Sequence, residues 1–306
     1  MSVVALAFRP VELSDGPRIR ALLAADPPVV ADMSFAYEYA HAHTPFVRAA
    51  FAETSGCGVY RWQEKGGTCF SYPFGGGDRR AALADLVGHC RTRAMPLTLL
   101  DVPRAVVDAL PDLLPDGFAV EPDRDEADYV YRASDLAELP GRLRQVRRRL
   151  IRRFDEAGPW SYAPIAAADD VEACRDILRE WMSAHPDGTP HLQDDCAALA
   201  ATLDAYFELD LTGGVLRQNG RPVAFACGER LSPDTMLVSF ERARPSVRGA
   251  NAMINREFAR HNCAGCTWIN RTCDGGDAGL RQVKLEYGPA RLVEKFLVRV
   301  PSAPSS

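Results

Sequence analysis

A hairpin between residues 214 and 228 constrains the fold of this chain more than any other sequence feature. Apolar runs flank Asn219-Gly220 on both sides, and the positive φ angles of a tight hairpin turn favour this dipeptide. The segments that follow alternate between strand and helix periods. They are a strand over 235–240, a helix over 249–261, a strand over 267–270, a helix with Lys284 and a strand over 291–300. The sequence thus predicts an α/β (α+β) fold with mixed, mainly antiparallel sheets flanked by helices.

The first half of the chain follows a similar order with shorter elements. Strand signals at 8–11, 57–63, 68–72, 97–100, 118–120 and 129–131 are mixed there with helix signals through Ile19, Leu22 and Leu23, at 78–90 and at 103–110. A chain of 306 residues is long enough for two domains of ordinary size. We therefore expect one domain over 1–132 and a second over 133–306. The weak similarity of their element order suggests a duplication, without a residue-level repeat that would prove it.

Composition excludes several classes of protein. A net charge of −5 and a pI near 5.7 argue against a protein that coats nucleic acid with its whole surface. The first ten residues lack a secretory signal, and no apolar run approaches the ~18 residues of a membrane span. These features predict a cytoplasmic protein.

The nine cysteines form an odd, scattered set, which favours free thiols in a reducing compartment over a disulfide framework. One group, His261, Cys263, Cys266 and Cys273, contains a pair with the spacing of a zinc knuckle. A second pair of the usual kind is missing, so we predict no metal site, and the sequence alone leaves the point open.

A basic helix is expected between the two halves. Residues 141–154 carry seven arginines, and Leu143, Val146, Leu150 and Phe154 recur at helical spacing, which predicts one buried stripe. The arginines then cover the remaining faces. They either pair with the acidic segment 121–128 or form a surface for a polyanion such as a CoA pyrophosphate, a tRNA backbone or anionic lipid headgroups.

The segment from Trp268 to Pro289 combines a glycine-rich turn with a short helix that presents Arg281, Lys284 and Tyr287. Only three of the 36 basic residues are lysines, namely Lys65, Lys284 and Lys295. In a chain that otherwise uses arginine, a lysine at this turn is either needed for its compact charge or present by chance. The segment could form a site for an anionic ligand with a carbonyl group.

These motifs together resemble those of a bacterial family of uncharacterised function that is related to the C-terminal catalytic domain of phosphatidylglycerol lysyltransferases. Leu139, Gly141, Arg148 and Phe154 match the family pattern in the basic helix. The C-terminal signature is matched by Asn270, Asp274, Gly276, Gly279, Leu280, Arg281, Lys284, Tyr287 and Pro289, and a third segment by Glu241-Arg242-Ala243, Gly249 and 255–259. The resemblance implies two tandem domains like acyl-CoA N-acyltransferases (GNAT-like), with a degenerate first domain and a catalytic second one. The order of elements after residue 214 agrees with that fold.

The resemblance also bears on the donor. CoA-dependent relatives cradle phosphate with an arginine-glycine-x-glycine run, whereas this chain has Arg248-Gly249-Ala250-Asn251. Asn251 in place of the last glycine hinders the close backbone approach that a pyrophosphate needs. The lysyltransferase-like relatives use aminoacyl-tRNA instead, which needs no such loop. We expect Arg248, Gly249, Asn251 and Arg148 to contact the donor.

Roles in acyl transfer can be assigned to the remaining residues as hypotheses. Lys284 would stabilise the oxyanion, Tyr287 would protonate the leaving group, and Glu241 would act as the base. Arg281 would hold a phosphate or carboxylate, and Asn270 and Asp274 would shape the turn or hold substrate. Plain alternatives exist: Lys284 caps its helix, Tyr287 is a core residue, and Glu241 pairs with Arg242 or Arg244.

The sequence therefore predicts an acyl- or aminoacyltransferase that moves an acyl group to an amine or a hydroxyl, with a lipid headgroup as one candidate acceptor. Acyl-CoA or aminoacyl-tRNA would be the co-substrate, with no tightly bound cofactor. The partners would be this anionic donor and, as a further candidate, an anionic membrane surface. The alternative is a binding module that holds a nucleotide, tRNA or lipid headgroup without turnover. The acceptor and the oligomeric state stay open.

Overall fold

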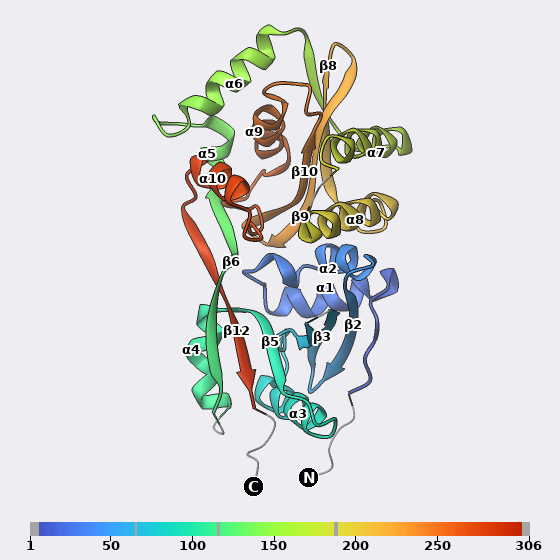
Figure 1. The fold of residues 1–306 in the computed structure, drawn as a ribbon, viewed down its shortest axis with the longest axis vertical. Coiled ribbons are helices and arrows are strands. Elements are labelled where there is room, and N and C mark those ends of the chain that lie inside the picture. The colour runs from blue at the N-terminus through green and yellow to red at the C-terminus, as the bar shows by residue number, and fades with distance from the viewer. Residues whose placement is uncertain (1–5, 65, 115–116, 187–188, 302–306) are drawn as a thin grey trace. The chain divides into compact units, whose positions relative to one another are not determined.

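The structure is a computed structural model that describes residues 6–64, 66–114, 117–186 and 189–301. Lys65, one of the three lysines, and the first five residues, on which the secretory-signal argument partly depends, lie outside the described residues. Contacts divide the chain into two compact units, residues 1–127 with 293–306 and residues 128–292. Each unit is described by itself (Figure 1). Among the described residues, no helix combines the length and the apolar character needed to cross a lipid bilayer.

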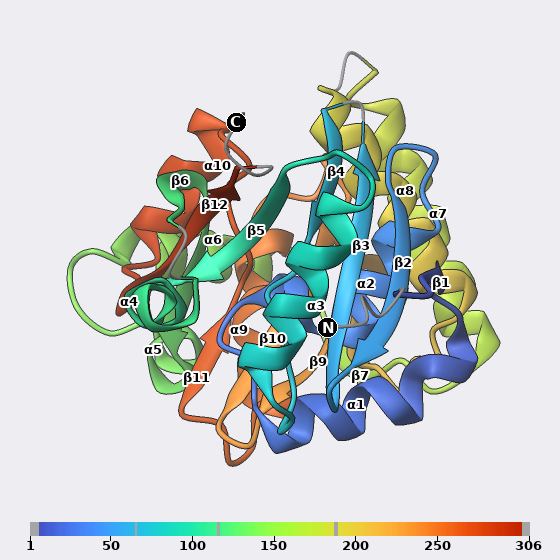
Figure 2. The same ribbon diagram turned by 90° about the horizontal axis from the view of Figure 1, so that it is seen from below.

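Unit 1 is a mainly antiparallel sheet with helices packed on it. Its strands lie in the order β1-β2-β3-β4-β5-β12, and Figure 2 shows β2, β3 and β4 side by side. The pair β4–β5 is parallel. In chain order its elements are β1 (Arg9–Pro10), α1 (Gly16–Ala25), α2 (Phe35–Ala42), β2 (Arg48–Thr54), β3 (Cys57–Glu64), β4 (Gly67–Phe70), α3 (Arg79–Arg91), β5 (Leu97–Pro103) and α4 (Arg104–Leu113), with two 3-10 turns, Leu13–Asp15 and Ala31–Met33. The core gathers side chains from α3, α4 and the strands, including Leu83, Leu86, Leu99, Leu110 and Phe296.

Unit 2 also contains mainly antiparallel strands with helices packed on them. Its strands lie in the order β6-β11-β10-β9-β8-β7, and only β10 and β11 are parallel. Helix α9 covers one face of β8, β9 and β10, while α7 and α8 lie on the other face (Figure 1). In chain order the elements are β6 (Ala119–Arg132), α5 (Ala133–Glu138), α6 (Gln145–Glu156), β7 (Trp160–Pro164), α7 (Ala168–Ser183), α8 (Pro190–Asp204), β8 (Thr212–Gln218), β9 (Arg221–Ser232), β10 (Thr235–Ala243), α9 (Ala250–Asn262), β11 (Trp268–Asn270) and α10 (Ala278–Glu286). The chain passes from unit 1 to unit 2 within β6 and returns within β12 (Arg291–Val300).

The fold class predicted from the sequence is confirmed. Strands β8 and β9 form the expected hairpin, and Asn219 and Gly220 have φ values of 50° and 77° at its tip. The sequence analysis did not anticipate β2 and α2. It also divided β6 into two short strands.

The last strand departs from the sequence-based division of the chain. Most of β12 belongs to unit 1, because Phe296 pairs with Val102 and Val298 pairs with Leu99 in β5. The division at residues 132 and 133 places this strand in the second domain. Pairing with a strand almost 200 residues earlier is a tertiary choice that local patterns do not reveal. Whether the two halves arose by duplication stays a prediction.

The predicted buried stripe of the basic helix is wrong in its first half. Leu143 is 59% exposed and precedes α6, and Val146 is 53% exposed, whereas Ile151 and Phe154 are buried. Only the second half of α6 packs on α9, since Leu150 and Phe154 lie against Gly249. Arg144 turns inward in place of Leu143, because it finds hydrogen-bond acceptors there.

Candidate functional site

The segment after β11 is a tight polar turn that ends in the N-cap of α10. Three residues of the turn adopt positive φ, Thr272 at 55°, Gly275 at 55° and Gly276 at 76°. Glycine reaches this region without strain, which explains its presence at two of these positions. The side chain of Asp277 accepts a hydrogen bond from the backbone N–H of Leu280 at 2.6 Å and so begins α10.

Asp274 and Arg281 bind each other across this turn. Arg281 donates from Nε and Nη2 to the two carboxylate oxygens of Asp274, at 3.0 and 2.6 Å. The Tyr129 hydroxyl adds a hydrogen bond of 2.6 Å, and the N–H of Gly276 adds one of 3.1 Å. Burial alone would raise the pKa of Asp274, but the hydrogen bonds from Arg281 and Tyr129 outweigh it and lower this pKa to about 2. The pair ties the turn to α10 and to β6.

We expect Asp274→Asn to remove part of the acid sensitivity of folding. The folded pKa of Asp274 lies below its ordinary value near 3.8. Its contribution to the free energy of unfolding is therefore complete above about pH 4 and is lost as the pH falls toward 2. A depression of this size corresponds to about 2 kcal/mol. Urea unfolding at pH 7 and pH 3 should show a smaller pH-dependent loss in the variant, and an equal loss in both proteins would contradict the assignment.

Asn270 also holds the turn. Its Nδ2 donates to the carboxylate of Asp128 at 2.8 Å, and its Oδ1 accepts from the N–H of Thr272 at 2.8 Å. Asn270 thus makes both hydrogen bonds within the protein, and its side chain is fully buried. The contacts of Asn270, like those of Asp274, are those of residues that shape the turn.

Lys284 reaches into the same turn from α10. Its ammonium group donates to the carbonyl oxygens of Arg271 at 2.7 Å and Thr272 at 3.1 Å, and to that of Cys273. The residue is 5% exposed, and burial lowers the pKa of Lys284 to about 8. Three carbonyl groups that converge on one atom suit a tetrahedral ammonium, whereas the planar fork of an arginine cannot serve them together. This geometry explains a lysine at this position in an arginine-rich chain.

A cluster of polar side chains lies beside the turn, at the end of β10. Glu241 Oε2 accepts from Asn255 Nδ2 of α9 at 3.1 Å and from Arg271 Nη2 at 3.3 Å. The side chain of Glu241 is 15% exposed. Three buried polar atoms of this region have no hydrogen-bond partner among the described residues. They are Arg271 Nη1, Asn255 Oδ1 and Ser239 Oγ, the last of which lies in the same strand as Glu241. Unpaired buried polar atoms are costly, so this cluster has the character of a binding site.

Tyr287 follows α10 and packs beside the same arginine. The guanidinium groups of Arg271 and Arg147 lie 4.9 and 4.8 Å from its ring centre. Tyr287 is 2% exposed, and burial raises its pKa to about 12. Arg147 also pairs with Glu286 at 2.5 Å, which links α6 to the end of α10. The structure thus brings Glu241, Arg271 and Tyr287 together.

The pairing between β10 and β11 ends beside this cluster. The parallel ladder between β10 and β11 ends at Leu237 and Asn270, whereas β10 continues to Ala243 alongside β9. A bulge between Val238 and Phe240 interrupts the pairing with β9 at this point. Bulges bend a strand and redirect its side chains. Glu241 and Arg271 therefore lie where two neighbouring strands stop pairing.

The predicted donor loop is covered on one side. Gly249, with φ of 89°, is the N-cap of α9, and a Cβ atom there would collide with the carbonyl oxygen of Leu150 in α6. A glycine at position 249 therefore allows α6 to pack closely against the start of α9. Arg248 and Asn251 on either side are exposed.

Two arginines of the basic helix region, the buried Arg144 and the exposed Arg148, have structural contacts. Arg144 donates to the carbonyl of Tyr287 at 2.7 Å and to the carboxylate of Asp135 at 3.0 Å. Arg148 donates to the carbonyl of Gly141 at 2.7 Å and to that of Leu139, which ends α5 with φ of 52°. Arg148 thus closes the loop between α5 and α6, and it also borders a pocket described below.

The cysteine and histidine group is dispersed. All nine cysteines are free, and His261 stacks on Tyr162 with ring centres 4.9 Å apart. Across the described segments, no three His, Cys, Asp or Glu side chains come together in a way that could hold a metal ion.

Comparison with known proteins places the chain in a family. Residues 28–299 match the family model for the C-terminal region of phosphatidylglycerol lysyltransferase. The chain belongs to this family. No curated protein matches the chain significantly.

Solved structures agree with this membership. A conserved protein of unknown function from Bacteroides thetaiotaomicron is 32% identical, with 97% of this chain and 100% of that chain covered and a TM-score of 0.90. L-PGS from Bacillus licheniformis is 13% identical over 97% and 94% of the two chains, with a TM-score of 0.66. FemX is 11% identical over 97% and 98%, with a TM-score of 0.64. The last two share the fold expected from the sequence, GNAT-like and in tandem. The family resemblance inferred from the sequence is confirmed by the family model.

Within this lysyltransferase-related chain, two residues of the cluster escaped the sequence analysis. Arg271 stands next to Asn270 in the signature segment, and Asn255 begins the last part, 255–259, of the third matched segment. A signal for Arg271 existed, because a charged residue directly after a buried strand marks the end of a sheet where ligands bind. Asn255 gave no such signal, because its role depends on a hydrogen bond to Glu241 in β10, which the local sequence does not reveal.

Proposed function

We propose that this chain is an aminoacyl- or acyltransferase whose reaction takes place at the Glu241–Arg271 cluster. The observation that carries the proposal is a carboxylate held by Arg271 and Asn255 at the point where β10 and β11 stop pairing. Membership of a lysyltransferase family supports the reaction class. The donor is an activated ester or thioester, and the acceptor is an amine or a hydroxyl.

The reaction needs one base, one acid and one site for negative charge. The acceptor atom attacks the donor carbonyl carbon and gives its proton to Glu241, while the bond to the leaving oxygen or sulfur breaks. Arg271 stabilises the oxyanion through its free Nη1, and Tyr287 gives its hydroxyl proton to the leaving atom. Solvent then returns the proton from Glu241 to Tyr287, so protons balance. Lys284 positions Arg271 by binding its backbone carbonyl.

Aminoacyl-tRNA suits this chain better as the donor than acyl-CoA. Helix α6 packs against Gly249, on the loop where a CoA pyrophosphate would approach the start of α9. Exposed arginines along α6, among them Arg149 and Arg153, offer phosphate contacts to a nucleic acid backbone. By analogy with its relatives, a lipid headgroup such as phosphatidylglycerol is the first acceptor to test. We propose that the protein is cytoplasmic, as predicted from the sequence, because nine free thiols are typical of a reducing compartment.

One observation favours the second candidate, a binding module without turnover. Asn270, Asp274 and Lys284 make hydrogen bonds within the turn itself and with β6 and α10. A chain that had lost catalysis but kept its fold would retain these residues. In that case the cluster would hold a polyanion without releasing a product.

Transfer from radiolabelled aminoacyl-tRNA tests the proposal directly. The purified chain is incubated with lysyl-tRNA or a mixed aminoacyl-tRNA pool and phosphatidylglycerol vesicles, and in parallel with labelled acetyl-CoA and small amines. Labelled lipid supports aminoacyl transfer, and labelled amine from acetyl-CoA supports the CoA-dependent reaction. Salt-sensitive tRNA binding without any transferred label supports the binding module and contradicts the enzyme.

A further inference from the structure

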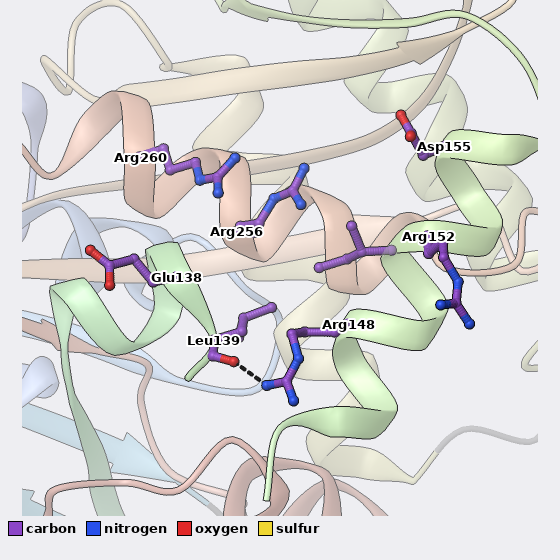
Figure 3. Close-up of a pocket in the computed structure, with 8 residues that line it drawn as sticks. Glu138, Leu139, Arg148, Arg152, Asp155, Arg256 and Arg260 are labelled. Carbon is purple, nitrogen blue, oxygen red and sulfur yellow. Dashed lines mark hydrogen bonds between the residues drawn. The ribbon is translucent and has the colours of Figure 1, made fainter. Parts of the chain in front are cut away.

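A pocket of about 310 Å³ opens between α5, α6 and α9, apart from the Glu241–Arg271 cluster. None of Glu241, Asn255 or Arg271 lines it. Arg148 and Arg152 reach it from α6, and Arg256 and Arg260 from α9 (Figure 3). Leu139 and Ile151 supply apolar contacts, and Glu138 and Asp155 stand at its margins. We call this space the α6–α9 pocket.

Two of the arginines are held in place by a buried carboxylate. Glu257 is 3% exposed and accepts from Arg256 Nε at 2.6 Å and from Arg260 Nη1 at 3.4 Å. Arg260 Nε also donates to the carbonyl of Ala137 at 2.9 Å. Because Arg256 and Arg260 are one turn apart on α9, both side chains extend along the same face toward α6 (Figure 3).

The third arginine closes the opposite wall. Arg148 is anchored by the carbonyl groups of Leu139 and Gly141, and the first of these bonds is drawn in Figure 3. A guanidinium group has five N–H donors, and Arg148 uses Nη1 in both bonds, so other donors are available for an anion. Anchored arginines lose less side-chain entropy when they bind a ligand.

The charge and the volume of the α6–α9 pocket indicate which class of ligand fits it. The lining residues comprise four arginines and two carboxylates, and the buried Glu257, which pairs with Arg256 and Arg260, offsets one further positive charge. The remaining excess of one positive charge favours an anion, and arginine binds phosphate in bidentate fashion. The volume lies at the lower end of the range of about 300–1,000 Å³ for small-molecule pockets. It leaves room for a phosphate group together with a small organic part.

We propose that the α6–α9 pocket binds a small phosphate monoester of about the size of a sugar phosphate. Arg148, Arg256 and Arg260 hold the phosphate group, and Glu138 and Asp155 accept hydrogen bonds from hydroxyl groups of the organic part. The two carboxylates repel a further phosphate, so a continuous polyphosphate or nucleic acid chain is disfavoured inside the pocket. This binding is independent of the transferase reaction.

Calorimetric titration with glucose 6-phosphate tests the proposal, with inorganic phosphate and glucose as parallel probes. We expect saturable binding of glucose 6-phosphate, weaker binding of inorganic phosphate, and no binding of glucose. Arg260→Gln should weaken the affinity about tenfold, since one charged hydrogen-bonding partner is lost. Glu257 keeps Arg256 as a partner in this variant, which favours retention of the fold. Arg148→Gln provides a second, independent variant.

The matched control is the double variant Arg149→Gln, Arg153→Gln, which removes two exposed charges from α6 outside the pocket. It should leave the affinity for glucose 6-phosphate within about twofold, because distant exposed charges are screened by salt. An equal loss in the control and in Arg260→Gln would assign binding to the whole basic surface and overturn the proposal. Absence of saturable binding, or equal affinity for inorganic phosphate, would overturn it as well.

Discussion

Glu241→Gln should reduce the rate of acyl transfer by about 10²- to 10⁴-fold, the usual contribution of a general base. The amide keeps the size of the side chain and one oxygen toward Arg271 and Asn255, but it cannot take the acceptor's proton. The transfer assay with aminoacyl-tRNA measures this loss at saturating donor. Circular dichroism and the thermal midpoint should stay close to those of the unchanged protein.

Glu156→Gln is the matched control for this experiment. Glu156 is an exposed carboxylate on α6 whose nearest cation, Arg152, lies 3.8 Å away. Its neutralisation should leave the rate unchanged, because exposed pairs of this kind contribute little. Full activity of Glu241→Gln would remove Glu241 from the reaction. A similar loss in both variants would indicate a general effect of charge.

Lys284→Met should lower the free energy of unfolding by about 3 kcal/mol, because it leaves buried carbonyl oxygens without a donor. Three such oxygens, of Arg271, Thr272 and Cys273, converge on the ammonium group. Lys284→Arg should also be destabilising, since a planar guanidinium is larger and cannot point at all three. Urea unfolding at neutral pH measures both effects.

This result separates two roles of Lys284. A positioning role predicts loss of stability in both variants, and a rate that falls because Arg271 is displaced. A direct oxyanion role predicts unchanged stability and a lower rate in Lys284→Met. The control Arg149→Met removes a cation of similar length from an exposed position of α6. It should change the free energy of unfolding by no more than about 0.5 kcal/mol.

Many of the elements could be predicted from the sequence because the signals for them are local. The Asn219-Gly220 turn and the alternating runs around it predicted β8 and β9, and the helical period predicted α9. The N-cap of α10, in contrast, was not predicted as such, because the sequence indicated only a polar turn before this helix. The same local reasoning failed for Leu143 and Val146, because helical spacing shows which residues share a face and does not show what covers that face.

The candidate site was less accessible to prediction. The signature correctly drew attention to Asn270, Asp274, Arg281 and Lys284, but their contacts lie within the turn and with β6. Arg271 and Asn255, which hold Glu241, come from two elements that meet only in the folded sheet. The catalytic roles of these residues stay predictions until the variants above are measured.

The sequence by itself determined the fold class, the family and the segment in which a lysine would matter. Hydrophobic period, turn residues and motif register are properties of neighbouring positions, so they can be read along the chain. Only the tertiary structure decided that the Lys284 ammonium is bound by three carbonyl groups and that Glu241 faces Arg271. The reason is that hydrogen-bond partners are chosen across the sheet and between helices, over distances in sequence that no local pattern records.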